Sequence, residues 1–243
     1  MTHYCYLTVD VLTVLVPFIF SFHPRIKYYQ KFLNHGLAAL PVATVFLIWD
    51  YYFTKMGFWG FNPDYVLGSY LFNLPLEEVF FFIAIPFSSL FTIHCLRIYL
   101  IKKWPNRFLT PLTFQIENSD PPKWIYLIVL FPAIITVLFW QQNYTRYTFL
   151  LLFILLFLSF RNNRNWNLLL LFALGYPIVL IPFLLVNGTL TGTFTQAPVV
   201  WYNPQQMIGL RVLTIPIEDF FYGFDLLFGI ALLSERLTYG KET

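Results

Sequence analysis

Seven apolar segments, separated by short polar stretches, occupy most of this 243-residue chain. An apolar stretch of about 17 to 25 residues is long enough to cross the roughly 30 Å hydrocarbon core of a bilayer. The segments lie near residues 4–22, 32–51, 74–100, 124–140, 147–160, 168–186 and 208–233. Since 58% of the residues are apolar and only 11% are charged, too few polar side chains remain to cover a soluble domain. The sequence therefore predicts an all-α integral membrane protein with about seven transmembrane helices.

The positive charges are divided unequally between the predicted loops. If the amino terminus is outside, twelve fall on the inner side: Arg25, Lys27, Lys31, Arg97, Lys102, Lys103, Arg107, Lys123, Arg161, Arg164, Arg236 and Lys241. Three fall on the outer side: Lys55, Arg146 and Arg211. Because short cytoplasmic loops are enriched in Lys and Arg, this asymmetry predicts an N-out, C-in topology. The charge thus reports orientation in a membrane, and we expect no nucleic-acid partner.

A pair of acidic residues lies within apolar sequence once in each half of the chain. Residues 74–78 read Leu-Pro-Leu-Glu-Glu, and residues 215–219 read Ile-Pro-Ile-Glu-Asp. An Asn-Pro pair precedes each motif at the same spacing, beginning at Asn62 and at Asn203. All these positions are related by an offset of 141 residues, which indicates an internal repeat.

The two motifs fall in the third and seventh predicted helices, which cross the membrane in the same direction. This predicts two parallel three-helix repeats related by a pseudo-twofold axis along the membrane normal. We expect a first repeat at residues 1–103, a cytosolic linker and connector helix at 104–146, and a second repeat at 147–243. Both acidic pairs would then lie at the same depth, at one interface.

Buried acids of this kind are candidates for proton chemistry. An ionised carboxylate in hydrocarbon costs several kcal/mol by most estimates, so these acids must be paired, protonated or in use. Adjacent helix residues point about 100° apart, so one acid of each pair can face the cavity between the repeats. A protonated carboxyl can act as a general acid, and an ionised one as a general base. Capping of helix starts is the alternative explanation. The catalytic candidates are Glu77, Glu78, Glu218 and Asp219.

Aromatic and polar neighbours supply further candidates. Aromatic faces stabilise cations, which predicts substrate contacts at Phe80, Phe81, Phe220, Phe221 and Tyr222. The predicted supporting residues are Asp50, Pro75, Pro216, Asn62, Asn203, Arg211 and Asp225. Arg211 and Asp225 lie seven residues to either side of Glu218, on about the same face of a continuous helix. Asp50 also fits an ordinary acid at the membrane interface, and Arg211 a side chain that extends to the headgroups.

Several signatures of cofactor and metal chemistry are missing. The chain has no glycine-rich dinucleotide turn and no P-loop, no Glu-x-x-His pair for a di-iron site, and no aspartate-rich run for Mg²⁺ and a diphosphate. We therefore expect neither cofactor nor metal. What remains is proton chemistry on a lipid-soluble substrate.

The duplicated P-x-E-E/D motif resembles that of the membrane-embedded lycopene cyclases of the heterodimeric and fused carotenoid cyclase type. The resemblance extends over essentially the whole chain. It includes Trp49-Asp50, the run Trp59-Gly60-Phe61-Asn62-Pro63, Thr2-His3-Tyr4 and Ser21-Phe22-His23-Pro24-Arg25. The second motif departs from the first by having Asp219 where the first has Glu78.

The resemblance implies a lycopene β-cyclase, an intramolecular lyase or isomerase that converts lycopene to γ-carotene and then β-carotene without a cofactor. It implies protonation of C2 at one end of lycopene, ring closure, and loss of a proton from C6. The expected partners are lycopene, membrane lipids and other enzymes of carotenoid biosynthesis, and the expected location is a prokaryotic cytoplasmic membrane.

Other functions remain open from the sequence. A related enzyme could cyclise or hydrate another acyclic C40 or C50 carotenoid. A proton-coupled transporter would also keep paired acids at a repeat interface, although few polar side chains are available to line a water path. A purely structural subunit would not require buried acids.

Overall fold

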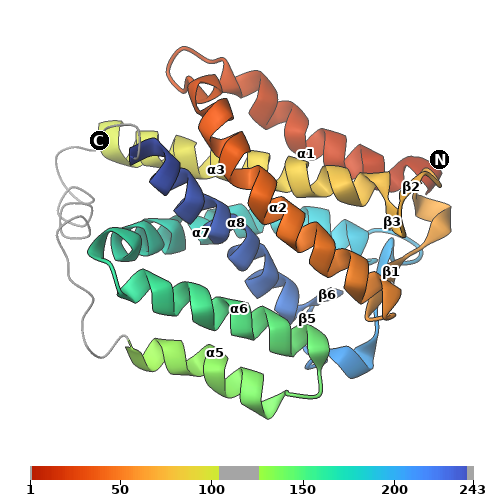
Figure 1. The fold of residues 1–243 in the computed structure, drawn as a ribbon. Coiled ribbons are helices and arrows are strands. Elements are labelled where there is room, and N and C mark those ends of the chain that lie inside the picture. The colour runs from red at the N-terminus through yellow and green to blue at the C-terminus, as the bar shows by residue number, and fades with distance from the viewer. Residues whose placement is uncertain (1, 104–125, 240–243) are drawn as a thin grey trace.

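A computed structural model describes residues 2–103 and 126–239, which form a bundle of α-helices. The seven helices of these ranges are α1 (Cys5–Ser21), α2 (Phe32–Lys55), α3 (Leu76–Lys103), α5 (Tyr126–Leu138), α6 (Asn143–Phe160), α7 (Asn163–Leu190) and α8 (Ile217–Tyr239). Successive helices run back and forth along the bundle, so that α1 begins at one end and α8 finishes at the other (Figure 1). The predicted all-α class is confirmed. Residues 104–125 of the predicted linker and connector (104–146), which include Arg107 and Lys123, lie outside the described residues, as does Lys241.

Four of the described helices are long and apolar enough to cross a membrane. They correspond to Tyr28–Lys55, Leu76–Ile98, Asn143–Phe160 and Asn163–Leu190. Helices α1 and α5 are apolar but have only 17 and 13 residues. Helix α8 has 23 residues but carries five charged ones: Glu218, Asp219, Asp225, Glu235 and Arg236. These lengths and compositions fit a membrane protein.

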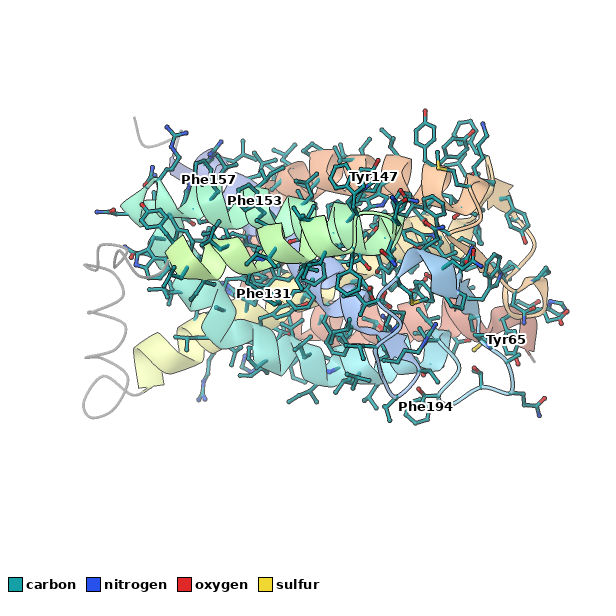
Figure 2. All side chains as sticks on the ribbon, turned by 90° about the horizontal axis from the view of Figure 1, so that it is seen from below. Tyr65, Phe131, Tyr147, Phe153, Phe157 and Phe194 are labelled. Atoms are coloured by element: carbon teal, nitrogen blue, oxygen red, sulfur yellow. The ribbon has the colours of Figure 1, made fainter. Side chains whose placement is uncertain are left out.

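The outer surface of the bundle is strongly apolar. On α5, Leu127 and Val137 are 67% and 70% exposed, and Leu40 on α2 is 70% exposed. Figure 2 shows the large side chains Phe131 and Phe157 on α5 and α6 at this surface. Exposed apolar surface on this scale requires lipid or a protein partner to cover it.

Helix α8 is the central element of the packing. Leu227 and Phe228 belong to a buried cluster with residues of α5, α6 and α7. Leu226 and Ile230 belong to a second cluster with residues of α2 and α3. Because its opposite faces pack against both sides of the bundle, side chains at the start of α8 are directed into the interior.

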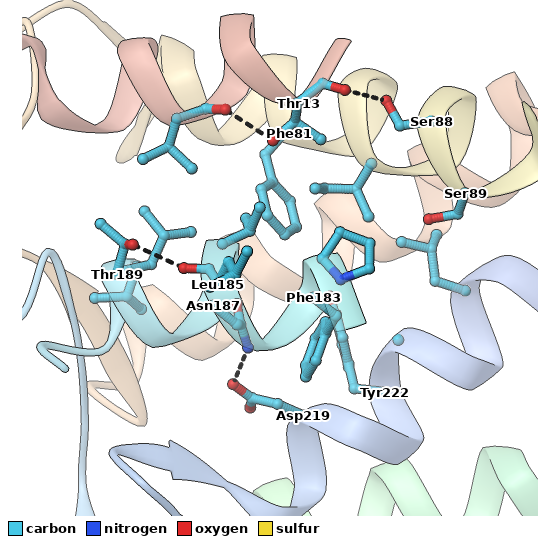
Figure 3. A pocket seen from close by; sticks show the side chains of 18 of the residues that line it. Thr13, Phe81, Ser88, Ser89, Phe183, Leu185, Asn187, Thr189, Asp219 and Tyr222 are labelled. Carbon is cyan, nitrogen blue, oxygen red and sulfur yellow. Dashed lines mark hydrogen bonds between the residues drawn. The ribbon is translucent and has the colours of Figure 1, made fainter. Parts of the chain in front are cut away.

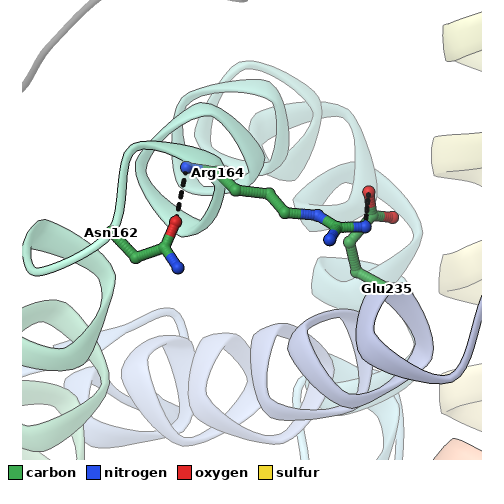
Figure 4. A network of polar contacts seen from close by, with 3 residues as sticks. All are labelled: Asn162, Arg164 and Glu235. Carbon is green, nitrogen blue, oxygen red and sulfur yellow. Dashed lines mark hydrogen bonds and ion pairs between the residues drawn. The ribbon is translucent and has the colours of Figure 1, made fainter. Parts of the chain in front are cut away.

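The end of the bundle opposite the acidic motifs is held by polar contacts. Asn162 caps α7 by accepting a hydrogen bond from the Arg164 amide at 2.9 Å. The Arg164 guanidinium lies 3.8 Å from the Glu235 carboxylate on α8 (Figure 4). This contact joins the start of α7 to the last turns of α8.

A short hairpin precedes each acidic helix. Strands β2 (Tyr70–Leu71) and β3 (Leu74–Pro75) pair before α3, and β5 (Arg211–Val212) and β6 (Ile215–Pro216) pair before α8. Gly68 and Gly209 take positive φ values of 78° and 88° at the same place before each hairpin. The last predicted apolar segment, near 208–233, includes the second hairpin, since α8 begins only at Ile217. Apolar residues there lie in the turn and hairpin, a pattern that hydropathy does not separate from a helix.

A further pair of strands joins the loops of the two halves. Strand β1 (Trp59–Phe61) runs antiparallel to β4 (Val200–Tyr202), with Gly60 opposite Trp201. Gly60 and Trp201 are equivalent under the offset of 141 residues. The pair Trp59–Tyr202 on one side is likewise equivalent to the pair Val200–Phe61 on the other. The small pair of strands is therefore symmetric about the Gly60–Trp201 pair. A Cβ atom on Gly60 would lie 2.4 Å from the Trp201 ring, which explains the glycine.

Backbone hydrogen bonds beyond the strands follow the same symmetry. The Asn62 amide donates to the Val199 carbonyl at 2.8 Å, and the Asn203 amide donates to the Phe58 carbonyl at 2.8 Å. Each bond is the equivalent of the other under the offset. The loops before the two acidic helices are thus locked together at one end of the bundle, where they cover the starts of α3 and α8.

Candidate active site

A cavity of about 530 Å³ lies inside the bundle and reaches the first turns of α3 and α8. Its walls come mainly from α1, α3, α7 and α8 (Figure 3). Residues of α2, α6, β1 and β4 line it as well, beside the acids. The volume is in the range of pockets that hold small organic ligands. The loop that contains β4 therefore folds over the part of the cavity beside the acids.

The structure separates the four candidate acids into two pairs with different positions. Glu78 and Asp219 line the cavity, whereas Glu77 and Glu218 do not. Each cavity-facing acid is the second residue of its motif, and all four side chains are buried. One acid from each half of the chain thus reaches the same chamber.

Glu77 and Glu218 are tied to the backbone of the preceding loops. The Leu67 amide donates to Glu77 Oε1 at 2.6 Å, and the Ile208 amide donates to Glu218 Oε1 at 2.7 Å. The Thr145 hydroxyl on α6 also donates to Glu218 Oε1, at 2.6 Å. These two carboxyls hold the loop against the start of its helix, and their contacts are structural.

Asp219 accepts hydrogen bonds from three neutral side chains. The Tyr144 hydroxyl on α6 donates to Oδ1 at 2.5 Å. The Asn187 amide on α7 and the Tyr202 hydroxyl on β4 donate to Oδ2 at 2.7 and 2.9 Å. Burial, followed by the nearby Asp219 carboxyl, raises the pKa of Tyr202 well above its usual value, so this loop tyrosine remains a donor. Three donors of this kind stabilise a carboxylate anion.

Glu78 has fewer partners. Its Oε2 accepts a hydrogen bond from the Tyr6 hydroxyl on α1. Asp50 on α2 also lines the cavity, and its Oδ1 accepts from the Trp59 indole and, at 3.5 Å, from the Thr54 hydroxyl. The other oxygen of Asp50 has no hydrogen-bond partner among the described residues. The acid end of the cavity therefore holds a third carboxyl beside the two from the motifs.

Among the described residues that line the cavity, none is positively charged. Three carboxyls in one mostly apolar cavity without a countercharge repel one another when ionised. Protonation of one of them relieves this repulsion, and Asp219, which has the most hydrogen-bond donors, is the carboxyl best suited to carry a negative charge. The arrangement is suited to having an acid and a base together.

Two of the five predicted aromatic contacts reach the cavity. Phe81 and Tyr222 line it. Phe221 instead packs against Phe149, with ring centroids 4.7 Å apart, and Phe220 packs against Phe183 on α7. Phe80 is not part of the lining either. Because successive residues rotate by about 100°, a run of aromatics cannot present every ring to one chamber.

The predicted supporting residues mostly shape the loops. Pro75 and Pro216 end the hairpins immediately before α3 and α8. Asn62 and Asn203 cap the short 3₁₀-helices Pro63–Tyr65 and Pro204–Gln206 by accepting hydrogen bonds from backbone amides. They fix the path of the chain towards each acid pair.

Asp225 lies on α8 with Glu218, seven residues further on, as predicted, whereas Arg211 is not on that helix. Arg211 lies in strand β5, is exposed, and donates to the Thr214 carbonyl, because the helix begins only at Ile217. Asp225 is buried on α8 but does not line the cavity. Asp10 on α1 is likewise buried, and neither aspartate has a hydrogen-bond partner among the described residues.

The donors to the acids were not identified from the sequence. Tyr6, Tyr144 and Thr145 lie 72 to 75 residues from the carboxyls they contact. Under the offset, Tyr6 is equivalent to Tyr147 rather than to Tyr144, so the repeat gives no signal for them. Only Tyr202, next to the repeated Asn-Pro pair, stood beside a recognised motif.

In the parts of the chain that the structure describes, no three His, Cys, Asp or Glu side chains are grouped so that they could hold a metal ion.

Comparison with known proteins matches residues 3–96 and 141–237 to a family described as lycopene cyclase. These residues make up most of the chain, and each segment contains one acidic pair. The chain belongs to the lycopene cyclase family. The predicted family resemblance is thereby confirmed.

The curated relatives of this family member are much longer proteins. A bifunctional lycopene cyclase/phytoene synthase of Neurospora crassa is 23% identical over 197 residues, which cover 80% of this chain and 27% of that protein. A bifunctional lycopene cyclase/phytoene synthase of Arthroderma gypseum is 38% identical over 64 residues, covering 26% of this chain and 11% of that protein. The chain thus spans at most about a quarter of the length of these relatives. No solved structure matches it.

Proposed function

We propose that this chain is a lycopene β-cyclase that closes the ends of lycopene by acid–base catalysis, without a cofactor. The observation that carries the proposal is the cavity that receives Glu78 from one half and Asp219 from the other, in an otherwise mostly apolar lining. Membership of the lycopene cyclase family supports the substrate class. The catalytic set is Glu78 and Asp219, with Glu77 and Glu218 as positioning residues.

The reaction moves protons and transfers no electrons. A carboxylic acid protonates C2 at one end of lycopene and leaves a tertiary cation at C1. The C5=C6 double bond attacks C1, which closes the ring and moves the cation to C5. Loss of the C6 proton to a carboxylate forms the double bond of the β-ring. The proton removed balances the proton added, so the product has the mass of the substrate.

The surroundings of the two acids favour different roles. Asp219 accepts hydrogen bonds from Tyr144, Asn187 and Tyr202, which stabilise its anion and suit it to accept the C6 proton. Glu78 has a single described donor, Tyr6, and shares the chamber with Asp50 and Asp219. Glu78 is therefore the group that keeps its proton and donates it to C2.

The cationic intermediate needs protection from water and a source of electron density. The rings of Phe81, Trp59, Tyr144 and Tyr222 line the acid end, and aromatic faces attract cations most strongly in a dry site. The β1–β4 pair covers this end from outside. These features suit a carbocation and disfavour the addition of water.

The proposal includes the architecture expected from the sequence. We place seven crossings in a prokaryotic cytoplasmic membrane, with the amino terminus outside and two parallel three-helix repeats at 1–103 and 147–243. The alternating helices in Figure 1 and the symmetric β1–β4 pairing support this arrangement. Lipids and other enzymes of carotenoid biosynthesis remain its expected partners.

Expression in a bacterium that accumulates lycopene tests the activity. We expect conversion of the red pigment to β-carotene, with a monocyclic intermediate, and no conversion by Glu78→Gln when the variant accumulates in the membrane at the wild-type level. A reaction in heavy water should place one deuterium in each new ring. A product heavier by one water would indicate a hydratase, and proton flux without pigment conversion would indicate a transporter. Either outcome would reject the proposed cyclase.

A further inference from the structure

The cavity extends far beyond the acid end. Along α3 its lining runs from Glu78 to Thr92, and along α7 from Leu190 back to Tyr176. Each interval of 14 residues corresponds to about 21 Å of helix at roughly 1.5 Å per residue. The chamber is therefore an elongated channel with the carboxyls at one end.

Three of the hydroxyl groups along this channel donate hydrogen bonds to backbone carbonyls of the protein itself. The Ser88 hydroxyl donates to the Thr13 carbonyl at 2.9 Å, and the Thr92 hydroxyl donates to the Ser88 carbonyl at 2.9 Å. The Thr13 hydroxyl donates to the Val9 carbonyl at 2.7 Å. Because these donors are already used, the wall offers little to water or to a polar solute. The channel is suited to a hydrocarbon.

One side of the channel opens at the surface of the bundle between α1 and α7. Leu12 and Val16 on α1 line the channel and are 61% and 57% exposed, and Leu185 on α7 lines it and is 60% exposed. Pro182 on α7 is also both a lining residue and exposed. Figure 3 shows α7, with Leu185 and Thr189, across the channel from Thr13 on α1. The opening lies along the apolar flank of the bundle.

We infer that this seam between α1 and α7 is a lateral port that holds the middle of a long polyene substrate, whose second end remains in the membrane. The inference rests on the proposed function. A polyene with two reactive ends can present only one of them to the carboxyls at the closed end of this channel. The rest of the chain must leave through the opening, and lipid is the phase in which it dissolves.

Lateral access to a single set of carboxyls makes the two ring closures successive. After the first ring forms, the monocyclic product must leave through the port and return with its other end towards Glu78 and Asp219. The two rings are then made in separate encounters at one site, rather than at the same time.

Tryptophan substitutions at the seam test the port. Leu12→Trp and Leu185→Trp should slow lycopene turnover roughly tenfold by filling the opening. The matched controls are Leu15→Trp on α1 and Leu174→Trp on α7, which are 46% and 50% exposed but do not line the channel. They should keep wild-type turnover. Equal rates for seam and control variants, all present in the membrane at equal amounts, would overturn the port.

A binding measurement separates the port from the chemistry. In a chain with Cys5→Ser, Cys95→Ser and Glu78→Gln, a thiol-reactive fluorophore is attached at Leu12→Cys or at Leu15→Cys, and the protein is placed in lipid vesicles. Added lycopene, which absorbs visible light, should quench the label at position 12 saturably and the label at position 15 only in proportion to lycopene in the lipid. Equal quenching at both positions would overturn the port even if the wild type cyclises lycopene. Saturable quenching at position 12 with no cyclisation by the wild type would reject the proposed function and leave the port as a polyene site.

Discussion

The two acidic segments have the same backbone but different surroundings. In both, a hairpin precedes the helix. The first acid accepts a hydrogen bond from the backbone amide ten residues earlier, with an N···O distance of 2.6 Å for Glu77 and 2.7 Å for Glu218. The second acids differ, because Glu78 has one described donor whereas Asp219 has three. Each acidic segment thus brings one carboxyl to the same cavity, while the neighbouring residues give the two carboxyls different hydrogen-bond partners.

Within each motif, the two acids also differ in what they contact. The first acid fastens the loop, and the second faces the cavity. The four carboxyls look interchangeable in the sequence, but two of them hold the loops and the other two line the cavity, where we propose that they are catalytic.

The largest expected effect comes from the two neighbours on α3. Glu78→Gln removes the proposed proton donor and should lower the rate of cyclisation by about 10²- to 10⁴-fold. Glu77→Gln retains an oxygen that can accept the Leu67 amide, so it should leave most of the activity intact. The initial rate of lycopene consumption in membranes with matched protein content provides the measurement. A loss of activity that is as large for Glu77→Gln as for Glu78→Gln would show that the division within the motif is wrong.

The next effect concerns the pair of strands β1 and β4. Gly60 and Trp201 face each other there at equivalent positions of the two halves, one without a side chain and the other with the largest one. Gly60→Ala places a Cβ atom 2.4 Å from the Trp201 ring and should destabilise the fold by about 1–3 kcal/mol. Trp201→Gly should relieve this cost in the double variant. Gly36→Ala, with no atom within 4 Å of the added Cβ, is the control and should not destabilise. Thermal denaturation in detergent measures all three, and an equal loss in both alanine variants would contradict the close approach.

A smaller effect should distinguish two threonines on α6. Thr145 donates to Glu218 at 2.6 Å, whereas the Thr148 hydroxyl is buried without a hydrogen-bond partner among the described residues. Thr145→Val should therefore cost about 1.5 kcal/mol of stability, because a buried carboxyl loses a donor. Thr148→Val should be neutral or stabilising. Equal melting temperatures for the two variants would show that the hydrogen bond from Thr145 does not stabilise Glu218. Glu218 would then be held by the backbone amide of Ile208 alone, as Glu77 is held by the amide of Leu67.

Much of this arrangement was predictable from the sequence. Hydropathy located the seven helices because the length of an apolar run and the charged residues at its ends are local properties. The offset of 141 residues located both acid pairs, and the rotation between adjacent helix residues indicated that each pair would be split.

The remaining features depend on contacts that no local pattern records. Which acid faces the cavity depends on where the helix begins, and the apolar hairpin Arg211–Pro216 concealed that boundary from hydropathy. The same error placed Arg211 on a helix face with Glu218. The donors Tyr6 and Tyr144 come from other helices, so their roles follow only from the packing of the bundle.

The smallest expected effect compares the hydrogen-bond donors to the two carboxyls that line the cavity. Tyr202→Phe removes one of three hydrogen bonds to Asp219, and we expect about a threefold loss of activity because Tyr144 and Asn187 still stabilise the anion. Tyr6→Phe removes the single described donor to Glu78 and should cost about tenfold, since the orientation of the proton donor is lost. The ratio of these losses, measured as kcat at saturating lycopene with protein folding checked by thermal denaturation, reports how unequal the two sites are. A larger loss for Tyr202→Phe than for Tyr6→Phe would reverse the comparison, because it would mean that the three donors to Asp219 act as one network and do not replace one another.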